Sequence, residues 1–238
     1  MPDFSERFWE IDSLRGIAII LMIISNFATD LAYFNIANLS SGFWWLFARL
    51  TAAIFLFLVG VSLAISYGKR GDDFKHYLKR GTKIFSWGLA VTAVTWLFLR
   101  EDLILFGVLH LIGISIILSY PFLKRRYNSF IYGVSAILVG LYLPNIIVAT
   151  KWLLPLGLAP ANYRYIDYFP IFPWVGVILI GLFFGNILYH NHKRKISIPD
   201  YSSRTKLLQF LGRNSLLIYL IHQPILIGIL TLLGLAYF

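Results

Sequence analysis

The feature that most constrains the fold is a series of apolar runs, each about twenty residues long, that follow one another along the chain. The sequence has 238 residues, of which 58% are hydrophobic and only 13% are charged. A water-soluble core cannot cover this much apolar surface, whereas a bilayer accepts each run of ~20 apolar residues as a helix that satisfies its own backbone hydrogen bonds. The sequence therefore predicts an all-α, polytopic transmembrane helical bundle, with residues 1–238 forming a single membrane domain. We expect about seven spans, near residues 12–34, 43–67, 83–99, 103–123, 128–149, 169–190 and 212–236.

Basic residues lie in alternate connections between these runs. Clusters of Lys and Arg fall at residues 69–80, 124–126 and 193–206, and the other connections carry few positive charges. By the positive-inside rule, this asymmetry predicts a cytoplasmic N-terminus and a multi-pass protein of the cytoplasmic membrane. Because the basic residues set topology in this way, the net charge of +10 does not predict a nucleic-acid partner. Acidic residues precede the first run without a small-residue cleavage site, so we expect the run to be kept as a helix.

The first span carries polar groups that the bilayer makes costly. At 100° per residue, Asp12, Arg15, Asn26 and Asp30 fall within an arc of about 60° and form one polar stripe along the helix. Each ionisable group inside a span costs ~2.5–3.5 kcal/mol without a partner, which indicates an internal cavity or a polar contact. Asp12 and Arg15 are either an interfacial ion pair or part of a ligand site, because Gly16 lets a second backbone or a ligand approach closely.

Two histidines lie within later spans. His110 is either a satisfied core residue or a catalyst. His222 is followed by Gln223 and Pro224, and this combination favours an ordered polar pocket. The chain has no cysteine, no zinc motif and no nucleotide-binding loop, so no metal site is predicted.

Four segments together resemble a known family. They are RFWEIDSLRGIAIILMIISNF at 7–27, FGVLHLIGIS at 106–115, DYFPIFPWVGVILIGLFFGN at 167–186 and FLGRNSLLIYLIHQP at 210–224. They resemble the small prokaryotic membrane proteins grouped with the catalytic domain of heparan-alpha-glucosaminide N-acetyltransferase. More distantly, the first and last segments are similar to transmembrane acyltransferases that O-acetylate surface polysaccharides.

The resemblance implies transfer of an acetyl or other acyl group from cytoplasmic acetyl-CoA to an amine or hydroxyl of a sugar-containing or other small acceptor reached from the outer side. A base near the acceptor and donors aimed at the thioester oxyanion are then needed. The candidate cofactor-binding residues are Asp12, Arg15 and Arg213, and the candidate catalytic residues are Asn26, Asp30, His110 and His222. The resemblance implies a catalytic His either at the position of Asn26, as in the O-acetylating relatives, or in the following outer loop, as in the heparan enzyme, but no His lies between Asn35 and Trp45. Under this resemblance only His110 or His222 could replace it.

Two alternatives stay open. A small-molecule or proton-coupled transporter would use Asp30, Arg49 and His110 as substrate or proton sites. Alternatively, Asp30 and Arg49 would form a structural ion pair in which each neutralises the other. A non-catalytic partner subunit would keep the acyltransferase fold without its chemistry.

The connection 151–168 is the expected external lid. The sequence names neither the acceptor nor the oligomeric state, and a homo-oligomer stays open.

Overall fold

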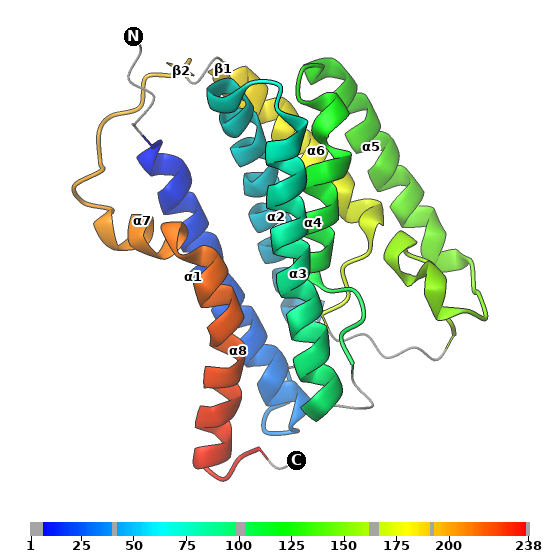
Figure 1. Cartoon of the computed structure of the whole chain (residues 1–238). Coiled ribbons are helices and arrows are strands. Elements are labelled where there is room, and N and C mark those ends of the chain that lie inside the picture. The colour runs from blue at the N-terminus through cyan, green and yellow to red at the C-terminus, as the bar shows by residue number, and fades with distance from the viewer. Residues whose placement is uncertain (1–6, 40–41, 99–102, 162–166, 191–192, 237–238) are drawn as a thin grey trace. The chain divides into compact units, whose positions relative to one another are not determined.

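The computed structural model describes residues 7–39, 42–98, 103–161, 167–190 and 193–236. The predicted all-α fold is confirmed, because helices form nearly all the regular structure of these residues (Figure 1). The α-helices are α1 (Trp9–Tyr33), α2 (Gly42–Arg70), α3 (Phe74–Phe98), α4 (Val108–Leu118), α5 (Arg126–Tyr142), α6 (Ile171–Leu188), α7 (Lys206–Arg213) and α8 (Ser215–Leu232). Short 3₁₀ helices occur at Tyr120–Phe122 (η1), Leu143–Asn145 (η2) and Lys151–Leu156 (η3), and β1 (Tyr189–His190) pairs with β2 (Lys193–Arg194) in an antiparallel hairpin.

The chain divides into two compact units. The first comprises residues 1–58 and 198–238, so it contains α1, the first part of α2, α7 and α8. The second comprises residues 59–197 and contains the last part of α2 with α3 to α6. The expectation of one membrane domain over the whole chain stays a prediction.

Among the described residues, five helical stretches are long and apolar enough to cross a membrane. They are α1, α2, α6, α8 and the stretch Tyr127–Asn145. Helix α4 is apolar but has only 11 residues, about 17 Å at 1.5 Å per residue against a hydrocarbon core of ~30 Å. Helix α3 has 25 residues and begins with the charged sequence FKHYLKRGTK. The polytopic bundle is therefore confirmed, and the count of seven spans stays a prediction.

The last predicted span, 212–236, corresponds to α8 but starts before it. Within residues 212–236, α7 ends at Arg213 and α8 begins at Ser215. The break falls at Asn214, whose side-chain Nδ2 donates to the Phe210 carbonyl oxygen at 2.8 Å. An asparagine that bonds to the preceding turn in this way competes with the regular helix ladder, which explains a bend that apolar content alone does not reveal.

Two glycines join the helices of the first unit. A Cβ added at Gly16 of α1 would lie 2.1 Å from the Leu208 carbonyl oxygen of α7. One added at Gly212 of α7 would lie 1.8 Å from the Asp12 carbonyl oxygen of α1. The backbones of α1 and α7 are therefore in direct contact, as Figure 1 shows where α7 crosses α1. The sequence left open whether a second backbone or a ligand approaches Gly16, and the structure places the backbone of α7 there.

The second unit uses glycines in the same manner. Gly81 of α3 faces Gly113 of α4, where an added Cβ would lie 2.7 Å from the Gly113 carbonyl oxygen. Gly133 of α5 and Gly176 of α6 make the corresponding close approach. Small residues at helix crossings are typical of membrane proteins, in which packing rather than the hydrophobic effect holds helices together.

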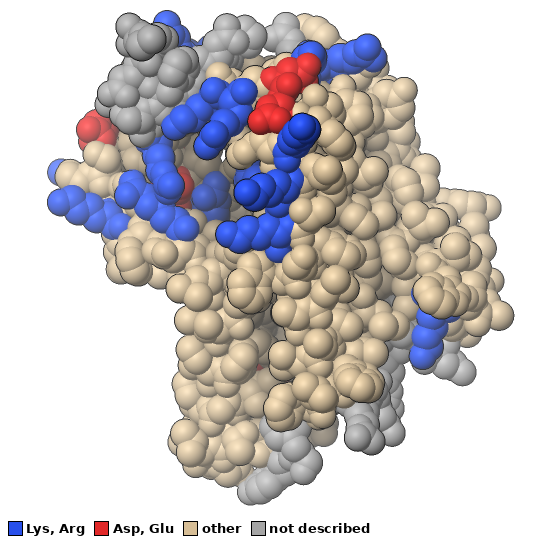
Figure 2. Space-filling model, viewed as in Figure 1, with Lys and Arg blue, Asp and Glu red and all other residues tan. Residues whose placement is uncertain are grey.

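Charged side chains concentrate at the helix ends. Within each unit, most lysine and arginine side chains gather at one end of its helices, and the surface along the remaining length shows few charges (Figure 2). Many large apolar side chains on that surface are exposed, including Trp96 at 61%, Leu138 at 62% and Leu217 at 57%. An apolar belt with charges beyond it is what a lipid-facing surface requires.

Candidate functional site

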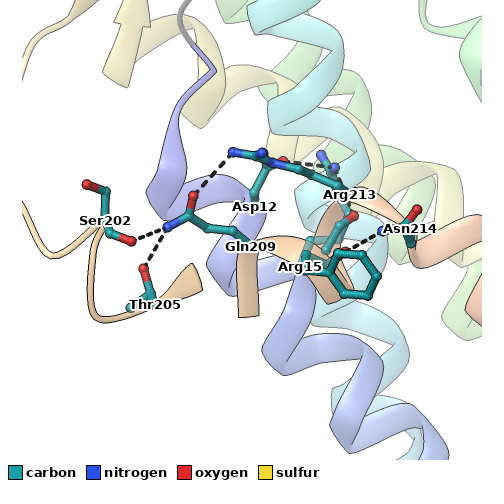
Figure 3. Close-up of polar contacts among 9 residues, drawn as sticks. Asp12, Arg15, Ser202, Thr205, Gln209, Arg213 and Asn214 are labelled. Atoms are coloured by element: carbon teal, nitrogen blue, oxygen red, sulfur yellow. Dashed lines mark hydrogen bonds and ion pairs between the residues drawn. The ribbon is translucent and has the colours of Figure 1, made fainter. Parts of the chain in front are cut away.

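The three predicted cofactor-binding residues meet where α7 crosses α1 (Figure 3). Asp12 Oδ1 lies 3.4 Å from Arg15 Nη1, and Asp12 Oδ2 lies 3.1 Å from Arg213 Nε. The Asp12 side chain is only 8% exposed, so its carboxylate is largely removed from water between two guanidinium groups. One negative charge shared by two positive charges leaves the cluster with a net charge of +1.

Further hydrogen bonds fix both arginines. Arg15 Nη1 donates to the Gly212 carbonyl oxygen at 3.5 Å. Arg213 Nη2 donates to Gln209 Oε1 at 3.2 Å. Gln209 in turn donates from Nε2 to the Ser202 carbonyl oxygen at 2.7 Å and to Thr205 Oγ1 at 3.0 Å, so it links Arg213 to the start of α7 (Figure 3). The ion pair considered from the sequence is present, and the Arg213 side chain is still 47% exposed, which leaves it accessible to an anion.

Asn26 and His222 form the second contact along the polar stripe. Asn26 Nδ2 lies 2.7 Å from His222 Nε2, and His222 Nδ1 lies 2.6 Å from the Tyr219 carbonyl oxygen. A carbonyl oxygen only accepts, so the network assigns the proton of the neutral ring to Nδ1 and leaves Nε2 as the acceptor of the Asn26 amide. The basic nitrogen of His222 therefore faces α1.

Asp30 and Gln223 form the next contact of α1 with α8. Gln223 Nε2 donates to Asp30 Oδ1 at 2.6 Å. Asp30 is 7% exposed, and its Oδ2 atom is buried without a hydrogen-bond partner among the described residues. Such an orphaned acceptor costs roughly 1–3 kcal/mol or more. Asn26 lies about 16 Å along α1 from Arg15, and Asp30 lies one helical turn further.

His110 belongs to the second unit and has a different setting. It is 2% exposed, and its ring stacks on Phe106 and meets the edge of Phe85. Its Nδ1 accepts from the Gly107 backbone N–H at 3.2 Å. Thr92 Oγ1 donates to the Ile104 carbonyl oxygen, so His110 Nε2, at 3.4 Å, donates to Thr92. Both ring nitrogens have internal partners, which favours a structural role. A catalytic role for His110 stays a prediction.

Arg49 does not pair with Asp30. Its guanidinium carbon lies 4.4 Å from the ring centre of Trp45, one turn earlier on α2. No ion pair joins Arg49 to Asp30, although both are described. A cation over an indole face is stabilised by the ring quadrupole, and Gln223 takes the place at Asp30. Sequence reasoning missed Gln209, and it singled out both Asp30 and Gln223 without pairing them, because an uncharged glutamine does not stand out as the partner of a carboxylate.

The expected external lid is described in part. Tyr168 Oη donates to the Leu154 carbonyl oxygen at 2.7 Å, which ties the two ends of the 151–168 connection together. Residues 162–166 lie outside the described residues.

Comparison with known proteins gives one match. The family model described as heparan-alpha-glucosaminide N-acetyltransferase, catalytic, matches residues 7–224. No curated protein and no solved structure matches the chain. The matched range begins before α1 and ends at Pro224, so it includes both contacts between α1 and α8 and the cluster around Asp12.

Proposed function

Since the chain belongs to the heparan-alpha-glucosaminide N-acetyltransferase catalytic family, we propose that it is a membrane acetyltransferase that moves an acetyl group from acetyl-CoA to an amine or hydroxyl of a sugar-containing acceptor. Membership in this family supports the statement that the chain is an acetyltransferase-like membrane protein. The donor, the acceptor, the cytoplasmic membrane and a cytoplasmic N-terminus are parts of the proposal.

The single observation that carries the proposal is the 2.7 Å contact between Asn26 Nδ2 and His222 Nε2. It places an amide donor and the lone pair of a neutral imidazole at one point inside an apolar helix pair. In acyl transfer, His222 Nε2 would take the proton of the attacking amine or hydroxyl as that group bonds to the thioester carbonyl carbon. The Asn26 amide, displaced from Nε2, would donate to the oxyanion that forms. Cleavage of the C–S bond then releases the CoA thiolate, which recovers the proton from His222.

Asp30 is the proposed acceptor-binding residue. Its Oδ2 atom is buried and has no partner in the described part of the chain. A hydroxyl or amine of the acceptor would donate to this oxygen and so lie one turn from Asn26. Gln223, bonded to the other carboxylate oxygen, keeps Asp30 oriented on the side of α8.

The donor phosphates are proposed to lie at the cluster around Asp12, about 16 Å along α1 from Asn26. Arg213 offers the exposed guanidinium there, and Asp12 and Arg15 hold it in place. The acetyl thioester lies at the end of the long pantetheine arm, so anchoring the phosphates at this cluster leaves the thioester free to reach towards Asn26.

The test is acetyl-CoA binding and thioester hydrolysis by protein purified in detergent, comparing wild type with His222→Gln. Glutamine keeps a polar side chain beside Asn26 but cannot accept a proton at neutral pH. Loss of a general base lowers turnover by about 100-fold or more, and acetyl-CoA binding stays unchanged. His76→Gln, at the start of α3 in the second unit, is the matched control and keeps wild-type turnover. Equal turnover in all three proteins would refute His222 as the base.

A transporter is the second candidate function, and the orphaned Oδ2 of Asp30 is the observation that favours it. A buried carboxylate with one oxygen unpartnered among the described residues also suits a proton or cation site. Proteoliposomes distinguish the two: proton-coupled flux abolished by Asp30→Asn, without any acetyl-CoA turnover, supports the transporter.

A further inference from the structure

The second unit contains a cavity of about 850 Å³ at the end of the unit where α2 stops and α5 starts. We propose that this cavity binds the phosphate of a phosphate ester whose remaining part is apolar or aromatic. The lining residues that would contact this ligand are Tyr67, Lys124, Arg125, Tyr127, Tyr189 and Lys195. The proposal does not depend on acetyl transfer, because it rests on the cavity alone.

The charge of the cavity selects an anion. Among the described residues that line it, three are cationic, Lys124, Arg125 and Lys195, and none is Asp or Glu. Lys124 is already bonded to Asp72, which lies outside the lining. The side chains of Arg125 and Lys195 form no hydrogen bond or ion pair with the described residues, and both are exposed. Two free cations at one cavity match the charge of a phosphate group.

The start of α5 adds to this preference. Arg125 is the N-cap residue and makes no side-chain hydrogen bond to the first turn of the helix. Ser129 N–H bonds to the Arg125 carbonyl oxygen, so the regular ladder begins only there. Tyr127 and Asn128, which belong to the first turn, form part of the cavity wall. The positive end of the α5 dipole therefore lies at the same place as the free cations, an arrangement that favours phosphate.

The walls suit the rest of the ligand. Tyr67, Tyr127 and Tyr189 bring aromatic rings with polar tips to the cavity. Beyond its mouth, α5 exposes a run of apolar side chains, among them Phe130 at 41% and Ile131 at 61%. The phosphodiester of an anionic lipid would fit with its acyl chains along α5, and a nucleotide phosphate would fit with its base on a tyrosine ring. Phosphate is common to both, and basic pockets between transmembrane helices are known to bind lipid headgroups.

The experiment uses the full chain in nanodiscs and two double variants. Arg125→Gln/Lys195→Gln removes the two free cations of the cavity. Lys75→Gln/Lys79→Gln removes two exposed cations of α3 that do not line it, and so controls for the general attraction of a basic surface to anions. Phosphatidylglycerol at low fraction in phosphatidylcholine, followed by native mass spectrometry, measures lipid retention. Adenosine 3′,5′-bisphosphate in pure phosphatidylcholine, followed by equilibrium dialysis, measures binding of the soluble phosphate. Thermal unfolding verifies that each variant is folded.

We expect the wild type and the control variant to bind one of the two ligands, and the cavity variant to lose about ten-fold or more in its affinity or occupancy, as expected for lost charge-assisted hydrogen bonds. Loss confined to phosphatidylglycerol identifies the lipid headgroup as the source. Loss confined to the bisphosphate identifies a nucleotide and would place the donor phosphates here rather than at Arg213. Equal losses in both double variants, or no binding of either ligand to wild type, overturns the proposal. His222→Gln retains the binding whether or not the proposed acetyl transfer occurs.

Discussion

The substitution Gly212→Ala tests the crossing of α1 and α7 most directly. A Cβ at this position would lie 1.8 Å from the Asp12 carbonyl oxygen and 2.8 Å from the carbonyl carbon. Both atoms belong to a helix backbone, so no side-chain rotation relieves the overlap. The helices must separate by about 1 Å or more before van der Waals contact is restored.

That separation affects the ion pair as well as the packing. Arg213 Nε is 3.1 Å from Asp12 Oδ2, and moving α7 away carries this distance beyond hydrogen-bonding range. Overpacking at a close contact costs typically ~1–3 kcal/mol. For a chain of this length, we expect the melting temperature to fall by about 2–12 °C.

The assay is thermal unfolding in detergent, followed by the loss of the monodisperse peak in size-exclusion chromatography. Gly228→Ala is the matched control, because Gly228 lies on α8 of the same unit and an added Cβ meets nothing within 4 Å. Alanine favours a helix over glycine by up to about 1 kcal/mol, so this control is neutral or slightly stabilising. If Gly212→Ala melts at the same temperature as Gly228→Ala, α7 does not contact α1 as described.

Three further substitutions have clear expected outcomes. Asp12→Asn removes the charge shared by two guanidinium groups and lowers the free energy of unfolding by about 2 kcal/mol. In the double variant with Gly212→Ala, the decrease in melting temperature is smaller than the sum of the two single decreases. Full additivity would contradict a shared contact. His110→Ala empties a buried site and costs about 2–4 kcal/mol, while acetyl-CoA turnover per mole of folded protein is unchanged; a specific loss of turnover would restore His110 as a catalyst. Hydrogen bonds from Lys124 and then from Tyr120 hold the pKa of the Asp72 carboxyl below its ordinary value. Because the folded pKa is lowered, the contribution of Asp72 is complete above its unfolded pKa of ~3.9 and is lost as pH falls through the lower folded value. The difference in melting temperature between wild type and Asp72→Asn is therefore constant from about pH 5 to 8 and shrinks towards pH 3; a difference that grows on acidification would refute this.

The sequence predicts much of the fold because the determining signals are local. Apolar runs and the helical period depend only on neighbouring residues, so the helices and the polar stripe of α1 were predictable. The structure brings three of the stripe's members, Asp12, Asn26 and Asp30, into contact with side chains of α7 or α8. Composition did not reveal the break at Asn214, because it depends on one side-chain hydrogen bond to Phe210 rather than on polarity.

The partners of the polar groups were harder to predict because they depend on tertiary packing. Charge alone suggested Arg49 for Asp30, but the neutral Gln223 fills that place. The cavity of the second unit was also not predicted. Arg125 and Lys195 are 70 positions apart in the sequence and belong to different basic clusters, whose pattern indicates only topology. Only the fold brings them to one cavity.

The bond between Asp12 and Arg213 also bears on biosynthesis. The two residues are 201 positions apart, so α1 is made long before its partner helix exists. At roughly 5–20 residues per second, synthesis of the intervening chain takes about 10–40 s. During that interval Asn26 and Asp30 lack the contacts that α8 provides, inside a segment that must already be entering the bilayer. The contacts that satisfy the polar groups of α1 therefore form only after α7 and α8 have been synthesised, and a chain that stalls before α7 leaves the polar stripe of α1 without them.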